Sequence, residues 1–248
     1  MNYLVGDIGN TLIKLSILNN KFNIQKIYNF ETAKIYQKNN ISKFLKKINK
    51  KHINKRVLLS SVVPRAFTII KKKLSKKKFH VSEIKEIDLK NIIKIKIKRY
   101  SQLGSDRISN ALGALNYKNS IIIDFGTATT FDVVINGVYE GGVISPGVKL
   151  SILNLNKSTA LLPILKLKNT KKIYGKNTQE ALNAGFLWGY QGLINNIIKK
   201  ISSKTKLNFK IILTGGYAKL FKKHIKGKTI IDQNITIKGV TKILKEMI

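Results

Sequence analysis

The sequence predicts an α/β protein built from two similar halves. Runs of Ile, Leu and Val alternate with stretches whose apolar residues recur every three to four positions, so strands should alternate with helices. The pattern strand, Asp-x-Gly, strand occurs near the start of the chain and again near its middle, with its aspartates 117 residues apart. A chain of 248 residues can bury roughly 70–75% of its unfolded surface, which is enough for two packed lobes.

The second copy of this pattern, residues 121–134, gives the first indication of function. Three isoleucines lead into Asp124, and a second apolar run follows the turn at Gly126. An aspartate at a strand end, beside glycine and threonines, can hold a metal ion and offer N–H and hydroxyl groups to phosphate oxygens. On this stretch alone, a plain hairpin with a polar turn remains an equal alternative.

The first copy, residues 3–18, strengthens the functional interpretation. Asp7, Gly9 and Thr11 follow a short apolar run, and a second apolar run begins at Leu12. Two such hairpins facing one cleft would form a phosphate-binding architecture by duplication. The remaining periodicities predict strands near 21–30, 56–63, 81–97 and 211–213, and helices at 32–36, from 41, at 65–78, after 107, at 148–157, after 177 and at 240–248.

At two predicted helix starts, polar residues that could have a functional role can also be explained as helix caps. In the structural interpretation, Ser105 is an N-cap and Asp106 is an acid that interacts favourably with the positive end of the helix. The functional interpretation is a carboxylate that accepts a substrate hydroxyl proton beside the anion-binding Arg107. Asn177 and Glu180 are spaced as a capping box for a long helix, whose Gly185 and Gly189 favour close contact with a helix of this chain or with a dimer partner.

Composition excludes several classes of function. The chain has no cysteine, which excludes disulfides, thiolate metal sites and cysteine nucleophiles, and its three histidines are too far apart to be a ligand pair. No apolar run approaches ~18 residues and the first strand begins at once, so we expect a cytoplasmic protein without a membrane span or signal peptide.

The formal net charge of +35 has two explanations. It would favour nucleic acid by Coulomb attraction, but only four of the 47 basic residues are arginine, the side chain best suited to reading phosphates and bases. The excess of Lys, Ile and Asn is typical of an AT-rich genome. We therefore expect nucleic-acid binding to be at most non-specific.

A set of short motifs, in this order, resembles the type III pantothenate kinases over essentially the whole chain. The motifs are DIGNT at 7–11, LGSDR at 103–107, DFGTATTFD at 124–132, GGVISPG at 141–147, GKNT at 175–178 and TGG at 214–216. The resemblance implies two ribonuclease-H-like lobes of the actin-like ATPase type, with a cleft between them. The lobes would be residues 1–117 and 118–248. It also implies a homodimer that phosphorylates pantothenate with ATP, using Mg²⁺ and a monovalent cation, K⁺ or NH₄⁺.

The resemblance assigns roles by position. Asp106 would be the catalytic proton acceptor, Asp124 would bind the monovalent cation, and Asp7 would lie near magnesium. Tyr100 would contact pantothenate, although the family's tyrosine usually lies about three residues further ahead of the Gly-x-Asp-Arg turn. ATP would be bound by Asp7, Ile8, Gly9, Asn10, Thr11, Leu12, Ile13, Lys14 and Thr127, and pantothenate by Tyr100, Gly104, Ser105, Asp106, Arg107 and Thr178.

Two alternatives remain open from the sequence. The family includes proteins named as accessory factors for gene regulation, so a non-catalytic relative that binds nucleic acid is one alternative. Another actin-like small-molecule kinase is the second. Intact Asp7, Asp106 and Asp124 argue against the first, and the Gly-x-Asp-Arg and Gly-Lys-Asn-Thr turns argue against a sugar kinase.

Overall fold

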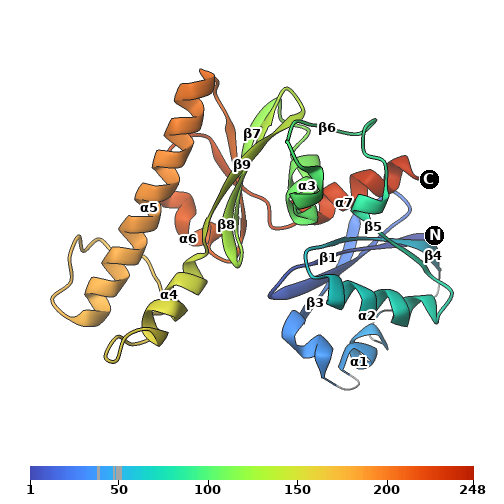
Figure 1. Cartoon of the computed structure of the whole chain (residues 1–248), viewed down its shortest axis with the longest axis horizontal. Helices are drawn as coiled ribbons and strands as arrows, with labels where there is room; N and C mark the ends of the chain where they lie inside the picture. The colour runs from blue at the N-terminus through green and yellow to red at the C-terminus, as the bar shows by residue number, and fades with distance from the viewer. Residues whose placement is uncertain (38–39, 47, 49–51) are drawn as a thin grey trace. The chain divides into compact units, whose positions relative to one another are not determined.

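The computed structural model describes residues 1–37, 40–46, 48 and 52–248. They form two compact units, unit 1 comprising residues 1–116, 137–139 and 234–248, and unit 2 comprising residues 117–136 and 140–233. The C-terminal helix therefore belongs to unit 1 (Figure 1). The two units are groups of residues in mutual contact, and such groups do not test a domain boundary in the sequence. The expected boundary between residues 117 and 118 therefore remains a prediction.

Unit 1 contains a five-stranded sheet in the order β3-β2-β1-β4-β5. The first three strands pair antiparallel, whereas β4 lies parallel to β1 and β5 parallel to β4. The first predicted hairpin is thus confirmed as β1 and β2. The strands are β1 (Asn2–Ile8), β2 (Leu12–Leu18), β3 (Ile24–Glu31), β4 (Ile53–Ser61) and β5 (His80–Glu83).

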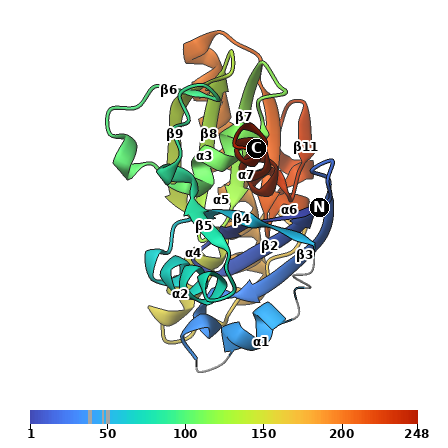
Figure 2. The same ribbon diagram turned by 90° about the vertical axis from the view of Figure 1, so that its right-hand side faces the viewer.

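Helices cover both faces of this sheet. Figure 2 shows α1 and α2 together on one side, where Phe44, Ile70 and Leu74 pack against buried strand residues such as Leu15 and Val57. On the other side, α7 packs so closely on α3 that a Cβ at Gly239 would overlap the backbone of Ser109. The helices are α1 (Asn40–Lys46), α2 (Pro64–Ser75), α3 (Ser105–Gly113), α7 (Ile235–Glu246) and the 3₁₀ helices η1 (Thr32–Tyr36), η2 (Ile84–Glu86) and η3 (Tyr100–Gln102).

Unit 2 repeats the strand order of unit 1. Its sheet runs β11-β10-β7-β8-β9, which matches β5-β4-β1-β2-β3, and the short β6 (Lys94–Ile95) pairs with Val138 and Tyr139 of β9. The second predicted hairpin is confirmed as β7 and β8, which pair antiparallel. The shared order supports the duplication inferred from the two Asp-x-Gly turns. The strands are β7 (Asn119–Phe125), β8 (Ala128–Ile135), β9 (Val138–Pro146), β10 (Lys210–Gly215) and β11 (Thr229–Ile231).

The helices of unit 2 pack on one face of its sheet. Phe131 and Leu213 from the sheet are fully buried with Leu187 of α5 and Phe221 of α6. The elements are α4 (Val148–Lys157), α5 (Thr178–Thr205), α6 (Ala218–Phe221) and η4 (Lys222–His224). Within the described ranges, no helix combines the length and apolarity needed to cross a bilayer.

Gly185 and Gly189 of α5 do not pack closely against another described helix of this chain, which was one of the two interpretations of their spacing. A Cβ built at Gly185 or Gly189 meets no atom within 4 Å among the described residues. The within-chain interpretation of this glycine face is therefore wrong. Contact with a dimer partner is the alternative that remains.

Candidate active site

The first hairpin places Asp7 near the carboxyl end of β1, between two polar neighbours. Asp7 lies opposite Lys14 on β2 and Ser60 on β4, and directly paired residues of adjacent strands project from the same face of a sheet. The exposed turn after β1 is held by Thr32, whose hydroxyl donates a 2.7 Å hydrogen bond to the Gly9 carbonyl. Thr32 therefore supports the predicted phosphate loop, and it is also the first residue of η1, whose N-cap is Glu31.

The Gly-x-Asp-Arg turn forms the start of α3, one residue earlier than the capping pattern predicts. Gly104, with extended backbone angles, is the N-cap, and the predicted cap Ser105 is the first helical residue, only 2% exposed. The Asp106 carboxylate accepts a 2.8 Å hydrogen bond from the Arg107 N–H. The carboxylate is therefore fixed in orientation at the positive end of the helix.

Asp106 is a half-buried carboxylate whose pKa is raised above its ordinary value. Burial is the main cause, and it outweighs the hydrogen bond and charge of Arg107 and the more remote charge of Lys85, which all lower the pKa. Burial disfavours the charged form because the carboxylate loses part of its hydration. A raised pKa makes Asp106 a better proton acceptor than a fully solvated aspartate.

Val62 links this turn to the first hairpin. Its N–H donates a 3.1 Å hydrogen bond to the Ile8 carbonyl at the end of β1, and its side chain would lie 3.5 Å from a Cβ at Gly104. Unit 1 thus brings the Asp7 hairpin and the Asp106 turn to one end of the parallel strands β1 and β4, where α/β proteins bind ligands. Sequence reasoning missed Val62; the available signal was its place after a buried strand and before Pro64.

Glu83 ties the neighbouring loops together and was also missed. Its carboxylate accepts hydrogen bonds from the Ser61 N–H (3.2 Å) and the Lys85 N–H (2.7 Å). Lys85 in turn donates to the Ser101 carbonyl at 3.1 Å, beside Tyr100. A carboxylate 17 positions before Tyr100, the next predicted site residue, carries no local pattern, so only the fold could identify it.

Tyr100 opens η3 and lines a pocket within unit 1. The pocket has a volume of about 440 Å³, and its other lining residues are Ile87, Asp88, Leu89, Lys90, Ile93, Lys94 and Ile95. Burial raises the pKa of the Tyr100 phenol, and the charges of Glu83 and Asp88 raise it further. The phenol is therefore a neutral hydrogen-bond donor at physiological pH.

The second hairpin surrounds its aspartate with hydroxyl groups. Asp124 lies opposite Thr130 on β8 and Thr214 on β10. Gly215 has φ +82°, and a Cβ there would collide with the Asp124 carboxylate and the Phe125 backbone. The turn after β10 is fixed close to Asp124 by hydrogen bonds from Gly216 N–H to the Phe125 carbonyl (3.1 Å) and from the Gln233 amide to the Gly215 carbonyl (3.1 Å).

The other predicted residues of unit 2 lie on two further elements. Thr127 is exposed at the tip of the β7–β8 hairpin, where Gly147 packs against its carbonyl oxygen with no room for a Cβ. Thr178 is exposed at the first residue of α5, directly after the N-cap Asn177. The structure thus groups Asp124 with Thr127 on one hairpin and places Thr178 at a helix start.

The oxygen donors at Asp7 and Asp124 fit the two ions that the sequence suggests, Mg²⁺ and a monovalent cation. No group of three or more His, Cys, Asp or Glu side chains able to hold a metal occurs in the part of the chain that the structure describes. Magnesium in nucleotide sites needs only one or two carboxylates with substrate phosphates, a requirement that Asp7 meets. A cation that prefers several neutral oxygens fits Asp124 with Thr130 and Thr214 on the same face.

The fold is that of the actin-like ATPase and sugar-kinase class. The structure superposes with a TM-score of 0.65 on a Campylobacter jejuni protein assigned to the Baf family of transcriptional activators, at 20% identity over 98% of both chains. It superposes with a TM-score of 0.62 on a Sinorhizobium meliloti protein assigned as a 2-dehydro-3-deoxygalactonokinase, at 8% identity over 99% of this chain and 96% of the other. At these identities the similarity establishes the fold alone, and it confirms the predicted fold class.

The sequence comparisons identify the family. The model of the type III pantothenate kinase family matches residues 3–200. A type III pantothenate kinase of Pelagibacter ubique is 48% identical over 243 residues, covering 96% of each chain. The chain therefore belongs to the type III pantothenate kinases, as the motifs indicated, and it is a kinase.

Proposed function

We propose that this protein transfers the γ-phosphoryl group of ATP to the hydroxyl of pantothenate, giving 4′-phosphopantothenate in the first step of coenzyme A synthesis. The observation that carries this proposal is Asp106. Its half-buried, oriented carboxylate lies in the first turn of α3, and Val62 connects the start of this helix to the Asp7 hairpin. A proton acceptor next to a phosphate-binding turn is the arrangement that phosphoryl transfer to an alcohol requires.

The first hairpin would bind the phosphates of ATP. Residues Asp7 to Lys14 would supply turn N–H groups, the Thr11 hydroxyl and the Lys14 ammonium. Thr127, on the second hairpin, is a separate candidate for contact with ATP. Asp7 would hold Mg²⁺, which neutralises charge on the transferred group when it is bound. The exposed turn, stabilised by Thr32, is accessible to a ligand and held in shape.

Pantothenate would bind along the start of α3. Arg107 offers a guanidinium to its carboxylate, Gly104 and Ser105 offer backbone groups, and Tyr100 offers a neutral phenol. Thr178 would add a hydroxyl from α5 of a second copy of the chain, so that each pantothenate site would be completed across the homodimer. Asp106 would accept a hydrogen bond from the reacting hydroxyl and orient its oxygen toward the phosphorus, taking the proton late because the transition state is loose.

The second hairpin would bind a monovalent cation, K⁺ or NH₄⁺. Asp124 supplies one negative charge, and the paired positions carry neutral hydroxyls. The geometry of Gly215, which admits no side chain beside Asp124, leaves backbone oxygens near the carboxylate.

The protein would act as a homodimer in the cytoplasm. Unit 2 exposes a set of large apolar side chains on β9, α4 and the segment before α5. Figure 1 shows α4 and this segment near the N-terminal half of α5. Their exposed fractions would fall on association, a favourable change for apolar surface. These residues are Ile144, Leu150, Leu153, Leu161, Ile164, Ile173 and Tyr174. The open Gly185 and Gly189 face would allow a partner helix to approach closely.

The test is ADP release by the purified chain with ATP and Mg²⁺, with and without pantothenate. We expect turnover that depends on pantothenate and yields one phosphorylated product by mass spectrometry. Turnover with a sugar but not with pantothenate would contradict the proposal. An inactive protein with sequence-selective DNA binding at physiological ionic strength would favour the regulatory alternative instead, because non-specific binding to phosphates collapses with salt.

A further inference from the structure

Residues 165–177, here called the strap, run along α5 before entering it at Thr178. The strap has no regular secondary structure, and side chains of α5 hold it at successive points. The buried Asn183 side chain accepts from the Lys168 N–H (2.9 Å) and donates to the Lys168 carbonyl (3.0 Å). One turn further along α5, the Trp188 indole N–H donates to the Lys172 carbonyl at 2.9 Å. These contacts fix the start and middle of the strap.

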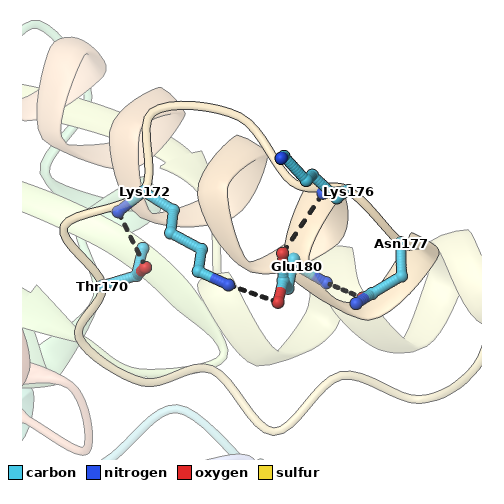
Figure 3. Close-up of polar contacts among 5 residues, drawn as sticks. All are labelled: Thr170, Lys172, Lys176, Asn177 and Glu180. Carbon is cyan, nitrogen blue, oxygen red and sulfur yellow. Dashed lines mark hydrogen bonds and ion pairs between the residues drawn. The ribbon is translucent and has the colours of Figure 1, made fainter.

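The end of the strap, residues 173–177, lacks a hydrophobic anchor. Within the single chain Ile173 is 81% exposed and Tyr174 is 75% exposed, so apolar burial inside the chain contributes little to its position. Polar contacts with Glu180 hold it instead (Figure 3). The Glu180 carboxylate accepts from the Lys176 N–H at 3.2 Å through one oxygen and pairs with the Lys172 ammonium through the other.

This arrangement differs from the capping box that the sequence predicts. The Asn177 side chain caps α5 by accepting from the Glu180 N–H at 2.9 Å, as expected. In a capping box the Glu180 carboxylate would return to the N–H of Asn177 itself, but here it reaches the N–H of the preceding Lys176. The carboxylate therefore constrains the turn outside the helix as well as the helix end.

The same turn is tightly packed against the helix start. A Cβ at Gly175 would overlap the Ala181 nitrogen and the Glu180 backbone, so the turn lies directly on the first turn of α5. Glu180 stays ionised in this position, because the hydrogen bond from Lys172 lowers its pKa, as does the Lys176 N–H. An ionised carboxylate accepts hydrogen bonds more strongly than a neutral amide oxygen.

We propose that Glu180 is a positioning residue for substrate binding: by accepting the Lys176 N–H hydrogen bond, it fixes residues 175–177 and so the Thr178 hydroxyl. This inference rests on the proposed role of Thr178 in binding pantothenate. Plain helix capping is already provided by Asn177, so the additional contacts of Glu180 act on the turn. Loss of Glu180 should weaken pantothenate binding and leave ATP binding unchanged.

The test compares Glu180→Ala with Glu180→Gln and Lys172→Met. Glu180→Ala should raise the KM for pantothenate roughly tenfold while the KM for ATP stays within about twofold, because only the pantothenate contact loses its fixed geometry. Glu180→Gln keeps an oxygen acceptor for the Lys176 N–H and should recover most of the loss. Lys172→Met removes only an exposed ion pair and should have little effect. Glu86→Gln, which breaks the exposed Lys71–Glu86 pair in unit 1, is the matched control and should behave as wild type.

Amide hydrogen exchange gives a readout that does not depend on the substrate. The Lys176 amide should exchange faster in Glu180→Ala than in wild type or Glu180→Gln, since its hydrogen bond is lost. Unchanged exchange, an equal rise in both KM values, or a Glu180→Gln variant as impaired as Glu180→Ala would each overturn the proposal. A wild-type protein without pantothenate turnover would count against the proposed function alone, and the exchange result would then decide whether Glu180 orders the turn.

Discussion

Asp7 and Asp124 occupy matching positions in two sheets of the same strand order, but different groups surround them. Asp7 lies between Lys14 and Ser60 on its neighbouring strands, whereas Asp124 lies between Thr130 and Thr214. The first acid therefore has a lysine and a serine at the paired positions of its neighbouring strands, and the second has two threonines there. A carboxylate with a lysine suits a polyphosphate and its magnesium, and a carboxylate among hydroxyls suits a lone cation.

The two turns are also supported in different ways. A side chain holds the first, through the Thr32 hydroxyl on the Gly9 carbonyl. Close backbone packing at Gly147 and Gly215 supports the second, and the Gln233 side-chain amide adds a hydrogen bond to the Gly215 carbonyl. The duplication thus preserved the position of the acid, and its neighbours diverged. The hairpin is a common scaffold, and in the proposed function the groups beside each aspartate determine what it binds.

The largest expected effect lies outside both hairpins, at Asp106. Asp106→Asn should lower kcat by roughly 10²–10⁴ while ATP still binds, because the amide cannot accept the hydroxyl proton. Steady-state kinetics with a nucleotide-binding titration would measure both quantities. Near-wild-type turnover would remove Asp106 from the mechanism and leave the hairpin acids as candidates for the proton acceptor.

Gly215→Ala should destabilise the packing around the second hairpin and leave the first hairpin unchanged. The residue has φ +82° and no space for a Cβ, so we expect a loss of about 2 kcal/mol in the free energy of unfolding. Gly216→Ala is the matched control, because its Cβ would meet only the Phe125 carbonyl at 4.0 Å, and it should cost less than about 1 kcal/mol. Urea unfolding would measure both; equal losses would contradict the close-packing argument.

Lys14→Met tests whether charge distinguishes the two hairpins. Removing the ammonium beside Asp7 should raise the KM for ATP about tenfold, since a phosphate contact is lost. Thr130→Val, the matching change beside Asp124, should leave the KM for ATP unchanged. A similar rise in both variants would mean that the two hairpins bind the nucleotide in the same way.

The smallest expected effect concerns pH. Burial raises the folded-state pKa of Asp106, so its contribution to stability is fully present below the unfolded pKa of ~3.9 and is lost as the pH rises through the folded value. The melting temperature of Asp106→Asn relative to wild type should therefore increase from about pH 4 to pH 7. A constant difference across this range would show that the carboxylate is not destabilised by burial.

The features that sequence could predict are those with local periodicity. Both hairpins, α4 and the Asn177 cap follow from apolar patterns and capping chemistry over a few residues. The contacts that sequence could not predict join distant segments: Val62 to Ile8, and β6 to β9. The cap of α3 was misplaced by one residue because Ser105 is a favourable cap by type, but its side chain is buried and Gly104 takes the extended conformation. The roles of the site residues were predicted from the motif resemblance. The contacts that hold those residues in place could be identified only from the fold.

The most direct test of the different roles of the two hairpins is a potassium titration of the pantothenate-dependent rate in wild type, Asp7→Asn and Asp124→Asn. We expect K⁺ to stimulate wild type and, at a much lower rate, Asp7→Asn with the same half-saturating concentration. Asp124→Asn should stay folded and lose the stimulation. Stimulation that persists in Asp124→Asn, or that disappears only in Asp7→Asn, would contradict the assignment of the cation to the second hairpin.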